Sequence, residues 1–307
     1  MLEGEKRVAV IDVGTNSTRL LVADVAGGRV SPLERRSTVT RLGRGVDLSG
    51  HLSSEAIEDV CAAIGGYIEI VEELGAETID AIATSAVRDA DNGSAFIAEL
   101  RERFALSARV LDGEEEARST YLGAISENLP SEPTLVVDIG GGSTELIVGS
   151  GREISFHDSL QVGVVRHTER HFTGDPPTAE EMEALATDVR GLIEGSVGAG
   201  VEARHGIAVA GTPTSLAAVE LGLEPYDPSR VHGHVLALPS IQRMLSQLAS
   251  VPLAERAETP GLHPHRAPNI VAGVVILVET MRAFGLEEVT VSEHDILYGT
   301  ALAAAHR

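Results

Sequence analysis

The chain has 307 residues, which is enough for two domains of about 150 residues each. Its 24 lysine and arginine residues face 46 aspartate and glutamate residues, and the net charge of −22 argues against general binding to nucleic acid or anionic membranes. Lys6 is the only lysine, so a phosphate loop of the Gly-Lys-Ser/Thr type is excluded. The single cysteine, Cys61, excludes disulfide frameworks and cysteine-based zinc sites. Neither a leader segment nor an apolar run of the roughly 20 residues that a bilayer needs is visible, so a cytoplasmic protein is expected.

An internal repeat organises the sequence. Residues 8–22 align without gaps on residues 134–148. Each copy contains a β-branched strand, an aspartate, a small-residue turn and a second strand with alternating apolar positions, which predicts a β-hairpin. A dinucleotide-binding fold would place a helix after the glycines, so the repeat is not that motif. The identical pairs are Val10/Val136, Asp12/Asp138, Gly14/Gly140, Ser17/Ser143, Thr18/Thr144, Leu20/Leu146 and Val22/Val148.

Helices and strands alternate around these hairpins, which indicates an α/β protein. Apolar residues at helical spacing predict a helix over residues 53–74, with serines available to cap its start. A second predicted helix, residues 114–125, opens with glutamates, as the dipole of a helix favours. The other predicted strands are 79–83, 108–111, 207–210 and 289–292, and the other predicted helices are 93–104, 178–193, 214–221, 240–248, 268–284 and 295–305.

A strand that ends in an aspartate and a small-residue turn suits phosphate binding. Backbone N–H groups of small turn residues can point into one concave nest that binds phosphate oxygens. The aspartate can hold a divalent cation, directly or through water. Two such copies would grip a phosphoryl group from both sides of a cleft. The alternative is two ordinary hairpins with glycine-rich turns, but the match at the Asp, Gly, Ser and Thr positions favours the functional interpretation.

The two copies also carry a family resemblance. Asp12-Val-Gly-Thr-Asn-Ser-Thr-Arg-Leu and Asp138-Ile-Gly-Gly-Gly-Ser-Thr-Glu-Leu resemble the phosphate motifs of the actin-like ATPase, sugar-kinase and heat-shock-chaperone superfamily. Within this superfamily, the residues of the two motifs resemble those of the exopolyphosphatase and guanosine-pentaphosphate phosphohydrolase family. Further motifs follow in family order over the whole chain: Thr84-Ser-Ala-Val-Arg88, Asp112-Gly-Glu-Glu-Glu116-Ala-Arg118, Ser159-Leu-Gln-Val-Gly163-Val-Val-Arg166, Ala210-Gly-Thr-Pro-Thr214, Tyr226-Asp-Pro-Ser-Arg-Val-His232-Gly, Arg266-Ala-Pro-Asn-Ile and Ser292-Glu-His-Asp-Ile.

The resemblance implies an α/β fold of two actin-like, ribonuclease-H-like lobes, with the active site in the cleft between them. Domain I would comprise residues 1–120, with a C-terminal helix 295–307 packing back on it, and domain II residues 121–294. The chain departs from the family near its end. Where members often have Gly-Leu-Arg-Glu-Gly, it has Asp295-Ile-Leu-Tyr-Gly299, so the role of that arginine has no counterpart at Leu297.

The resemblance also implies roles for single residues. The family's general base directly precedes Ala-Arg and corresponds to Glu116, which would deprotonate the water that attacks the P–O–P bond. On local grounds alone, the same glutamate could belong to an acidic helix start. Mg²⁺ or Mn²⁺ is the implied cofactor, with Asp12, Asp138 and Glu145 as candidate ligands. The candidate phosphate-binding residues are Asn16, Ser17, Arg19, Arg88, Gly141, Gly142, Ser143, Thr144 and Arg266, with Arg118 and Arg166 as further candidates.

Several functions fit these motifs. The leading one is the metal-dependent release of terminal orthophosphate from inorganic polyphosphate, with shorter chains preferred. Hydrolysis of the 5′ γ-phosphate of guanosine pentaphosphate is the alternative, and a related kinase or a catalytically silent nucleotide-binding regulator ranks lower. Nucleic acid and membranes are not expected partners, and a homodimer is left open. The histidine pairs His232/His234 and His263/His265 lack a third metal ligand at evident spacing, so structural or solvated roles are favoured.

Overall fold

The chain forms two compact units in the computed structural model. Unit 1 comprises Met1–Asn128 together with Asp295–Arg307, and unit 2 comprises the continuous segment Leu129–His294. Unit 1 is therefore built from the two ends of the sequence. The structure describes residues 5–198 and 200–306.

Two helices of unit 1 explain why it extends beyond the expected boundary at residue 120. Helix α5 (Gly113–Ala124) contains that position and packs against the C-terminal helix α13 (Ile296–Ala305). The two backbones touch. A Cβ atom added at Gly299 would lie 1.8 Å from the carbonyl oxygen of Ser119, a distance that no side chain allows. A boundary inside α5 would divide this contact, so α5 belongs entirely to unit 1.

Unit 1 is built on a five-stranded mixed sheet with the order β3-β2-β1-β4-β5. The first three strands are antiparallel neighbours, whereas β4 runs parallel to β1 and β5 runs parallel to β4. Parallel neighbours need long crossovers, which here contain helices. The strands are β1 (Lys6–Val13), β2 (Ser17–Ala26), β3 (Arg29–Val39), β4 (Thr78–Ala83) and β5 (Ala108–Val110).

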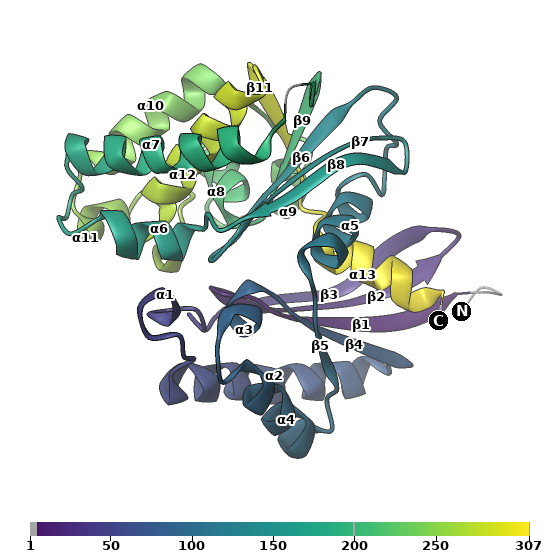
Figure 1. Cartoon of the computed structure of the whole chain (residues 1–307). Helices are drawn as coiled ribbons and strands as arrows, with labels where there is room; N and C mark the ends of the chain where they lie inside the picture. The colour runs from purple at the N-terminus through teal and green to yellow at the C-terminus, as the bar shows by residue number, and fades with distance from the viewer. Residues whose placement is uncertain (1–4, 199, 307) are drawn as a thin grey trace. The chain divides into compact units, whose positions relative to one another are not determined.

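Alternation along β1 gives this sheet two buried faces. Ala9 and Ile11 pack into the core beneath helix α2 (Ser54–Leu74), whereas Val8 and Val10 pack against the side of α13. Figure 1 shows α2 on one side of the sheet and the yellow helix α13 on the other. Strand β1 is thus covered on both sides, and its aspartate, Asp12, lies at the end of a rigid element.

Unit 2 contains a six-stranded sheet with the order β10-β11-β9-β6-β7-β8. Its strands β8-β7-β6-β9-β11 repeat the order and the directions of the five strands of unit 1. The internal repeat of the sequence therefore marks a duplicated sheet and not only a duplicated hairpin. The strands are β6 (Thr134–Ile139), β7 (Thr144–Ser150), β8 (Glu153–Leu160), β9 (His205–Val209), β10 (Val235–Ala237) and β11 (Glu288–Val291).

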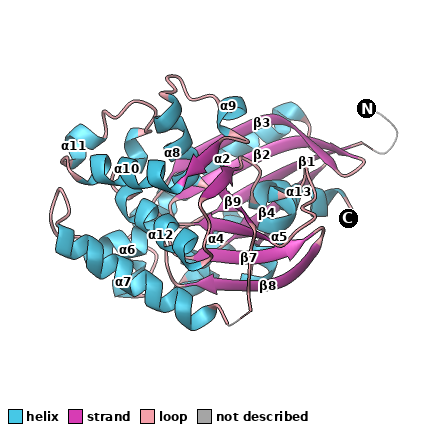
Figure 2. Cartoon of the chain, turned by 90° about the horizontal axis from the view of Figure 1, so that it is seen from above, coloured by secondary structure: helices cyan, strands magenta, loops and turns pink. Residues whose placement is uncertain are grey.

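Helix α12 (Ile270–Ala283) is the centre of the helical layer of unit 2. Every residue from Ile270 to Met281 is buried, which explains the longest apolar run of the sequence. Helices α6, α7, α10 and α12 lie close together (Figure 2). No helix in the described residues is long and apolar enough to cross a membrane. The surrounding helices are α6 (Val164–His171), α7 (Ala179–Ser196), α8 (Gly211–Leu221), α9 (Pro228–Val231), α10 (Leu238–Ala249), α11 (Leu253–Arg256) and the 3₁₀ turn η1 (Pro264–Arg266).

The α/β class and the alternating elements predicted from the sequence are confirmed, but the three strands β3, β8 and β10 were missed, as were the helices of eight residues or fewer. Both β3 and β8 follow the second strand of a hairpin and form an edge of their sheet. Strand β3 is mostly exposed and polar and contains Pro32 beside an irregularity in its pairing with β2, so it lacks an apolar signal. The remaining helices of unit 1 are α1 (Val46–Ser49), α3 (Ser85–Asp89) and α4 (Gly93–Phe104).

Candidate active site

The two predicted hairpins are present and have the same turn geometry. In unit 1 the backbone N–H of Gly14 donates to the carbonyl of Ser17 over 3.1 Å. In unit 2 the N–H of Gly140 donates to the carbonyl of Ser143 over 2.9 Å. The strand registers also correspond. In each hairpin the aspartate pairs with the residue two positions after the shared serine. The repeat therefore extends to single hydrogen bonds.

In unit 1 the turn is tied to the segment that follows β3. The carbonyl of Thr15 accepts from the N–H of Gly43 over 2.8 Å, and the carbonyl of Asn16 accepts from Thr40 and Arg41. A trans peptide directs its C=O and N–H to opposite sides. The N–H groups of Asn16 and of the next residue, Ser17, therefore point away from this segment, as a phosphate nest requires.

The turn of unit 2 is also held through its carbonyl groups, but here the segment that holds it is the start of helix α6. The carbonyls of Gly140 and Gly141 accept from the first N–H groups of helix α6, Val164 and Val165, over 2.9 Å each. The side chain of Arg166 donates through Nε to the carbonyl of Gly142 over 2.9 Å. By the same geometry, the N–H groups of Gly141, Gly142 and Ser143 point away from α6. These are three of the predicted phosphate-binding residues.

A glycine stands at each anchor because the backbones approach closely. A Cβ added at Gly163 would lie 2.3 Å from the carbonyl oxygen of Gly141. A Cβ added at Gly43 would lie 2.2 Å from Cγ2 of Thr15. The role of Gly43 was missed in the sequence, because its segment shows no motif of its own. The only signal was its place after the third strand, which corresponds to that of Gly163.

The residue opposite the aspartate distinguishes the two hairpins. In unit 1, Asp12 pairs across the strands with Arg19, whose Nη2 lies 2.6 Å from Asp12 Oδ2. In unit 2, Asp138 pairs with Glu145, so two carboxylates face each other at the equivalent position. Asp138 is 8% and Glu145 1% exposed, and Glu145 accepts from the hydroxyl of Ser159. A buried pair of oxygen donors of like charge is a suitable site for a hard divalent cation.

Arg19 contacts a second buried carboxylate that the sequence did not reveal. Its Nη1 donates to Asp295, the residue before helix α13. Burial opposes ionisation of Asp295, but Arg19, Arg35 and the N–H of Leu297 together hold its pKa below the usual value. Burial raises the pKa of Asp12 in spite of Arg19, and its Oδ1 has no hydrogen-bond partner among the described residues. Asp12 thus keeps one buried oxygen whose hydrogen-bonding capacity the described residues leave unused.

Glu116 lies in the first turn of α5 and points inward. It is 6% exposed, and its Oε2 accepts from Nη1 of Arg88 over 2.8 Å. The same Arg88 nitrogen donates to the carbonyl of Leu111, which fixes the guanidinium. Burial raises the pKa of Glu116, and the nearby Asp12 adds to this effect, whereas Arg88 and Arg19 lower it. Unit 1 therefore brings Glu116 together with three other predicted site residues.

The neighbouring Glu115 has a different task. Its backbone N–H donates to the side chain of Asp112, and its own carboxylate accepts from the N–H of Asp112, which forms a capping box. Glu115 is exposed. The acidic start of the helix thus combines a structural glutamate, Glu115, with a buried one, Glu116. The sequence allowed a helix-start role or a role in the site for Glu116, and the structure gives the helix-start role to Glu115.

The remaining predicted residues of the two units lie in more than one environment. The hydroxyl of Thr144 donates to the carbonyl of Val162, so it holds the turn. The guanidinium of Arg266 lies against Gly211 at the start of helix α8, with Nη1 2.3 Å from the place of an added Cβ. Arg118, by contrast, is exposed on α5. Leu297 is fully buried in the core with Val8 and Val10, so this position is structural here.

Comparison with known proteins agrees with this geometry. The sequence profile of the Ppx/GppA phosphatase family matches residues 21–304. Exopolyphosphatase 2 of Mycobacterium tuberculosis is 36% identical over 97% of this chain and 98% of its own length. The guanosine-5′-triphosphate,3′-diphosphate pyrophosphatase of Photobacterium profundum is 29% identical over 92% of this chain and 56% of its own length. The crystal structure of the Aquifex aeolicus Ppx/GppA family member superimposes with a TM-score of 0.84 at 32% identity and covers 97% of both chains.

The expected fold of two actin-like α/β lobes is thereby confirmed, since the superposition extends over nearly all of the chain. The profile match and the similarity to exopolyphosphatase 2 over nearly the whole length of both chains also identify the family of the sequence. The chain belongs to the Ppx/GppA phosphatase family.

Proposed function

We propose that this chain is an exopolyphosphatase, which hydrolyses the terminal phosphoanhydride bond of inorganic polyphosphate. The observation that carries the proposal is the duplicated turn, which directs backbone N–H groups to one side in each unit, combined with the buried carboxylate of Glu116. The M. tuberculosis relative, named an exopolyphosphatase, matches over almost its whole length and supports this substrate.

Glu116 is the proposed general base. A base that takes a proton from water works best when its pKa approaches the working pH. Burial raises the pKa of Glu116 in this direction, and Arg88 fixes the orientation of the carboxylate. Arg88 also supplies a positive charge beside the base, where it can contact the terminal phosphate. The water would approach the phosphorus in line with the leaving P–O bond.

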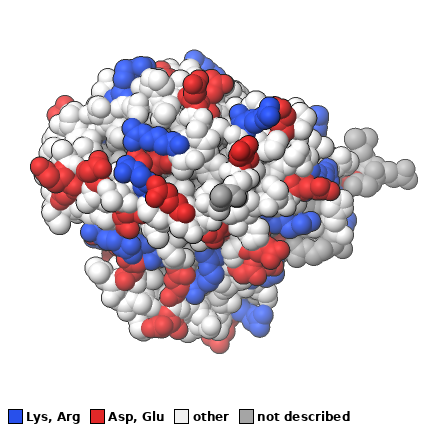
Figure 3. All heavy atoms as spheres, turned by 45° about the horizontal axis from the view of Figure 1, so that its top comes forward, with Lys and Arg blue, Asp and Glu red and all other residues white. Residues whose placement is uncertain are grey.

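The two turns are the proposed phosphate grips. N–H groups of Asn16 and Ser17 in unit 1, and of Gly141 to Ser143 in unit 2, would donate to phosphate oxygens. Such donors carry no net charge, so they bind a polyanion without a patch of lysines. Figure 3 shows acidic and basic side chains interspersed over the face that it draws, in keeping with an overall charge of −22.

A divalent cation of the Mg²⁺ or Mn²⁺ class fits the paired carboxylates of unit 2. Asp138 and Glu145 offer buried oxygen ligands, and Asp12 offers an oxygen without a partner in unit 1. When bound, such a cation neutralises phosphate charge that develops during hydrolysis. The residues themselves orient the donors. Ser159 holds one oxygen of Glu145, and Arg19 holds Oδ2 of Asp12.

Guanosine pentaphosphate is the second candidate substrate. The P. profundum relative, named a guanosine-5′-triphosphate,3′-diphosphate pyrophosphatase, supports it, but the present chain spans 56% of that protein. Both candidate substrates present a terminal phosphoanhydride, so the chemistry assigned to Glu116 is the same for both.

Orthophosphate release from short polyphosphate, long polyphosphate and guanosine pentaphosphate, measured side by side with Mg²⁺ and with EDTA, tests this proposal. We expect hydrolysis of polyphosphate, fastest on short chains, and loss of activity in EDTA. Release from guanosine pentaphosphate alone would favour the second candidate. Absence of release from all three substrates would favour a silent binding protein.

A further inference from the structure

A cluster of three metal-ligating side chains lies in unit 2 beside the anchor of the phosphate turn. His167 and His171 are four residues apart on helix α6, which places them on one face, and Asp188 faces them from helix α7. Their ligand atoms all lie within 4.8 Å of one another. This cluster differs from the histidine pairs considered in the sequence analysis. The sequence did not reveal it, because Asp188 lies near the two histidines only through the packing of helices α6 and α7.

The spacing of the cluster approaches that of a tetrahedral zinc site. Asp188 Oδ2 lies 3.0 Å from Nε2 of His171 and 3.5 Å from Nε2 of His167. Two donors on a zinc ion at about 2.0–2.1 Å lie roughly 3.3 Å apart in tetrahedral geometry. Two edges of the donor triangle therefore already match, and closing the third requires a movement of the partly buried His171, since all donor atoms lie within 4.8 Å.

One donor is buried without a partner. His167 is 0% exposed, and its Nε2 has no hydrogen-bond partner among the described residues. Burial lowers the pKa of His167 to about 4, so the imidazole is neutral at pH 7. An imidazole in this state can bind a metal without first losing a net charge.

We propose that His167, His171 and Asp188 form a binding site for a zinc-class divalent transition metal ion, separate from the oxygen ligands of the two turns. Two imidazoles and one carboxylate favour Zn²⁺, Co²⁺ or Ni²⁺ over Mg²⁺, which prefers oxygen ligands. A water molecule would complete the tetrahedron. Both imidazoles would bind through Nε2 and carry their proton on Nδ1.

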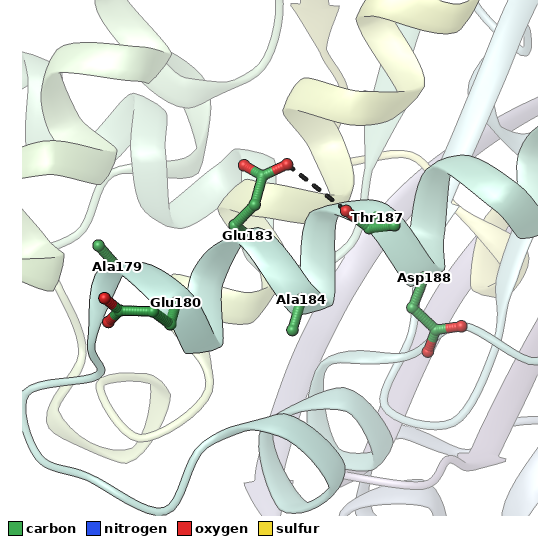
Figure 4. Close-up of a pocket in the computed structure, with 6 residues that line it drawn as sticks. All are labelled: Ala179, Glu180, Glu183, Ala184, Thr187 and Asp188. Carbon is green, nitrogen blue, oxygen red and sulfur yellow. Dashed lines mark hydrogen bonds between the residues drawn. The ribbon is translucent and has the colours of Figure 1, made fainter.

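The surroundings provide an entry for a cation. Asp188 lies at one end of an open depression along α7, which Glu180 and Glu183 also line (Figure 4). These carboxylates attract cations and repel phosphates. Arg170, whose guanidinium lies 3.8 Å from Asp188 Oδ2, balances the charge of Asp188 in the metal-free protein. Its side chain is 40% exposed and can swing into solvent when an ion binds.

Occupancy of this site would loosen the phosphate turn, a consequence that rests on the proposed function of that turn. Nδ1 of His167 accepts from the N–H of Gly163 over 3.3 Å. Once Nε2 binds a metal, Nδ1 carries the proton and can no longer accept. Gly163 packs directly on the backbone of Gly141 and Gly142, so loss of its hydrogen bond disturbs the turn. A zinc-class ion should therefore inhibit hydrolysis.

The binding test uses the full chain with Mg²⁺ in excess, so that oxygen sites are occupied, and titrates Zn²⁺ by calorimetry and Co²⁺ by visible absorption. We expect one ion per chain, with the intense visible bands of tetrahedral cobalt. His171→Ala should weaken binding by at least about 100-fold, because even residues around metal ligands are worth 10–100-fold. Asp188→Asn should act similarly, and Arg170→Gln should tighten binding.

His51→Ala, which removes an exposed histidine of unit 1, is the matched control and should leave binding unchanged. Unchanged zinc affinity in His171→Ala, or no binding by the parent chain, overturns the proposed site. Inhibition is measured separately. Zinc should raise KM for polyphosphate in the parent chain but not in His171→Ala. Binding without inhibition overturns the coupling to the turn, whereas a zinc-free chain that hydrolyses no substrate in the presence of Mg²⁺ overturns the proposed function and leaves the binding result intact.

Discussion

The hairpins of the two units share a backbone but differ in how their aspartates are balanced. In unit 1, Asp12 faces Arg19, and this arginine also binds Asp295. In unit 2, Asp138 faces Glu145. Like charges directly opposite each other destabilise a sheet, whereas an ion pair supports it. The comparison teaches that a duplicated fold can keep the backbone of its turn while placing an arginine opposite the aspartate in one copy and a carboxylate in the other.

The proposed general base and its arginine partner are present in only one of the two units. Glu116 and Arg88 lie in unit 1 beside the neutralised aspartate. The largest expected effect is therefore that of Glu116→Gln, which keeps the shape of the side chain but removes its ability to accept a proton. General-base catalysis contributes about 10²–10⁴-fold, so kcat should fall by this factor while polyphosphate affinity is retained or improves. Steady-state orthophosphate release measures both quantities.

Glu115→Gln is the matched control. Glutamine can replace glutamate in a capping box, so this exposed position should lose little activity. The pH profile gives a further check. Because burial raises the pKa of Glu116, the acid limb of kcat/KM should lie above the ordinary titration range of a glutamate, with activity rising as the carboxylate ionises. Equal activities for both variants and the parent chain would leave Glu116 as a structural helix residue.

The next largest effect concerns the residue opposite each aspartate, where the two units should lose unequal amounts of stability. Arg19→Gln leaves buried Asp12 without its cation, and breaking a buried pair costs about 3–5 kcal/mol. Glu145→Gln removes one of two facing like charges, and glutamine can still accept from Ser159, so the protein in EDTA should lose much less stability than Arg19→Gln does. The same change should remove the stabilisation that Mg²⁺ gives to the parent chain. Urea unfolding with EDTA and with Mg²⁺ measures these values.

A loss of stability for Glu145→Gln in EDTA, as large as that for Arg19→Gln, would contradict the comparison. It would mean that the carboxylate pair of unit 2 is balanced from within the protein. Asp138→Asn supplies an independent measurement of the same pair, since it removes the other charge and should also weaken the dependence of hydrolysis on Mg²⁺.

The anchors of the turns should respond unequally to an added methyl group. At Gly163 the new Cβ meets the backbone of Gly141 and Gly142, so the turn itself must move, and overpacking of this kind costs about 1–3 kcal/mol. At Gly43 the nearest atom belongs to the side chain of Thr15, and the backbone oxygen of Thr15 lies farther away, at 3.3 Å. Gly163→Ala should therefore raise KM for polyphosphate more than Gly43→Ala. Gly191→Ala, in open space on α7, is the control for substitution alone.

The smallest effect lies at the junctions that follow β4 and β9. Ala210 has φ 72° and ψ −168°, a conformation that costs a side chain energy, whereas the corresponding Thr84 has φ −120°. Ala210→Gly should therefore stabilise the protein by about 1 kcal/mol, and Thr84→Gly should destabilise it by a similar amount. Thermal unfolding of both variants checks the opposite signs. A gain for both would remove the inferred strain at Ala210.

The sequence predicted what depends on local patterns. The hairpins, the long helices and the core helix α12 follow from periodic apolar residues, and the turn residues follow from the repeat. Contacts between residues far apart in the sequence could not be predicted. Arg19 and Asp295 are 276 positions apart, and no local pattern links them. The sequence also could not assign the roles of Glu115 and Glu116, because that choice depends on which side of α5 the core covers.

The discontinuous build of unit 1 has a consequence for how the protein is made. Val8 and Val10 lie in strand β1, yet residues that cover them belong to helix α13, which is synthesised after the whole of unit 2. Unit 2 is one continuous segment and can complete its core as soon as it leaves the ribosome. Strand β1 must therefore keep one apolar face uncovered until α13 has been synthesised, so the unit that carries Glu116 completes its core after unit 2.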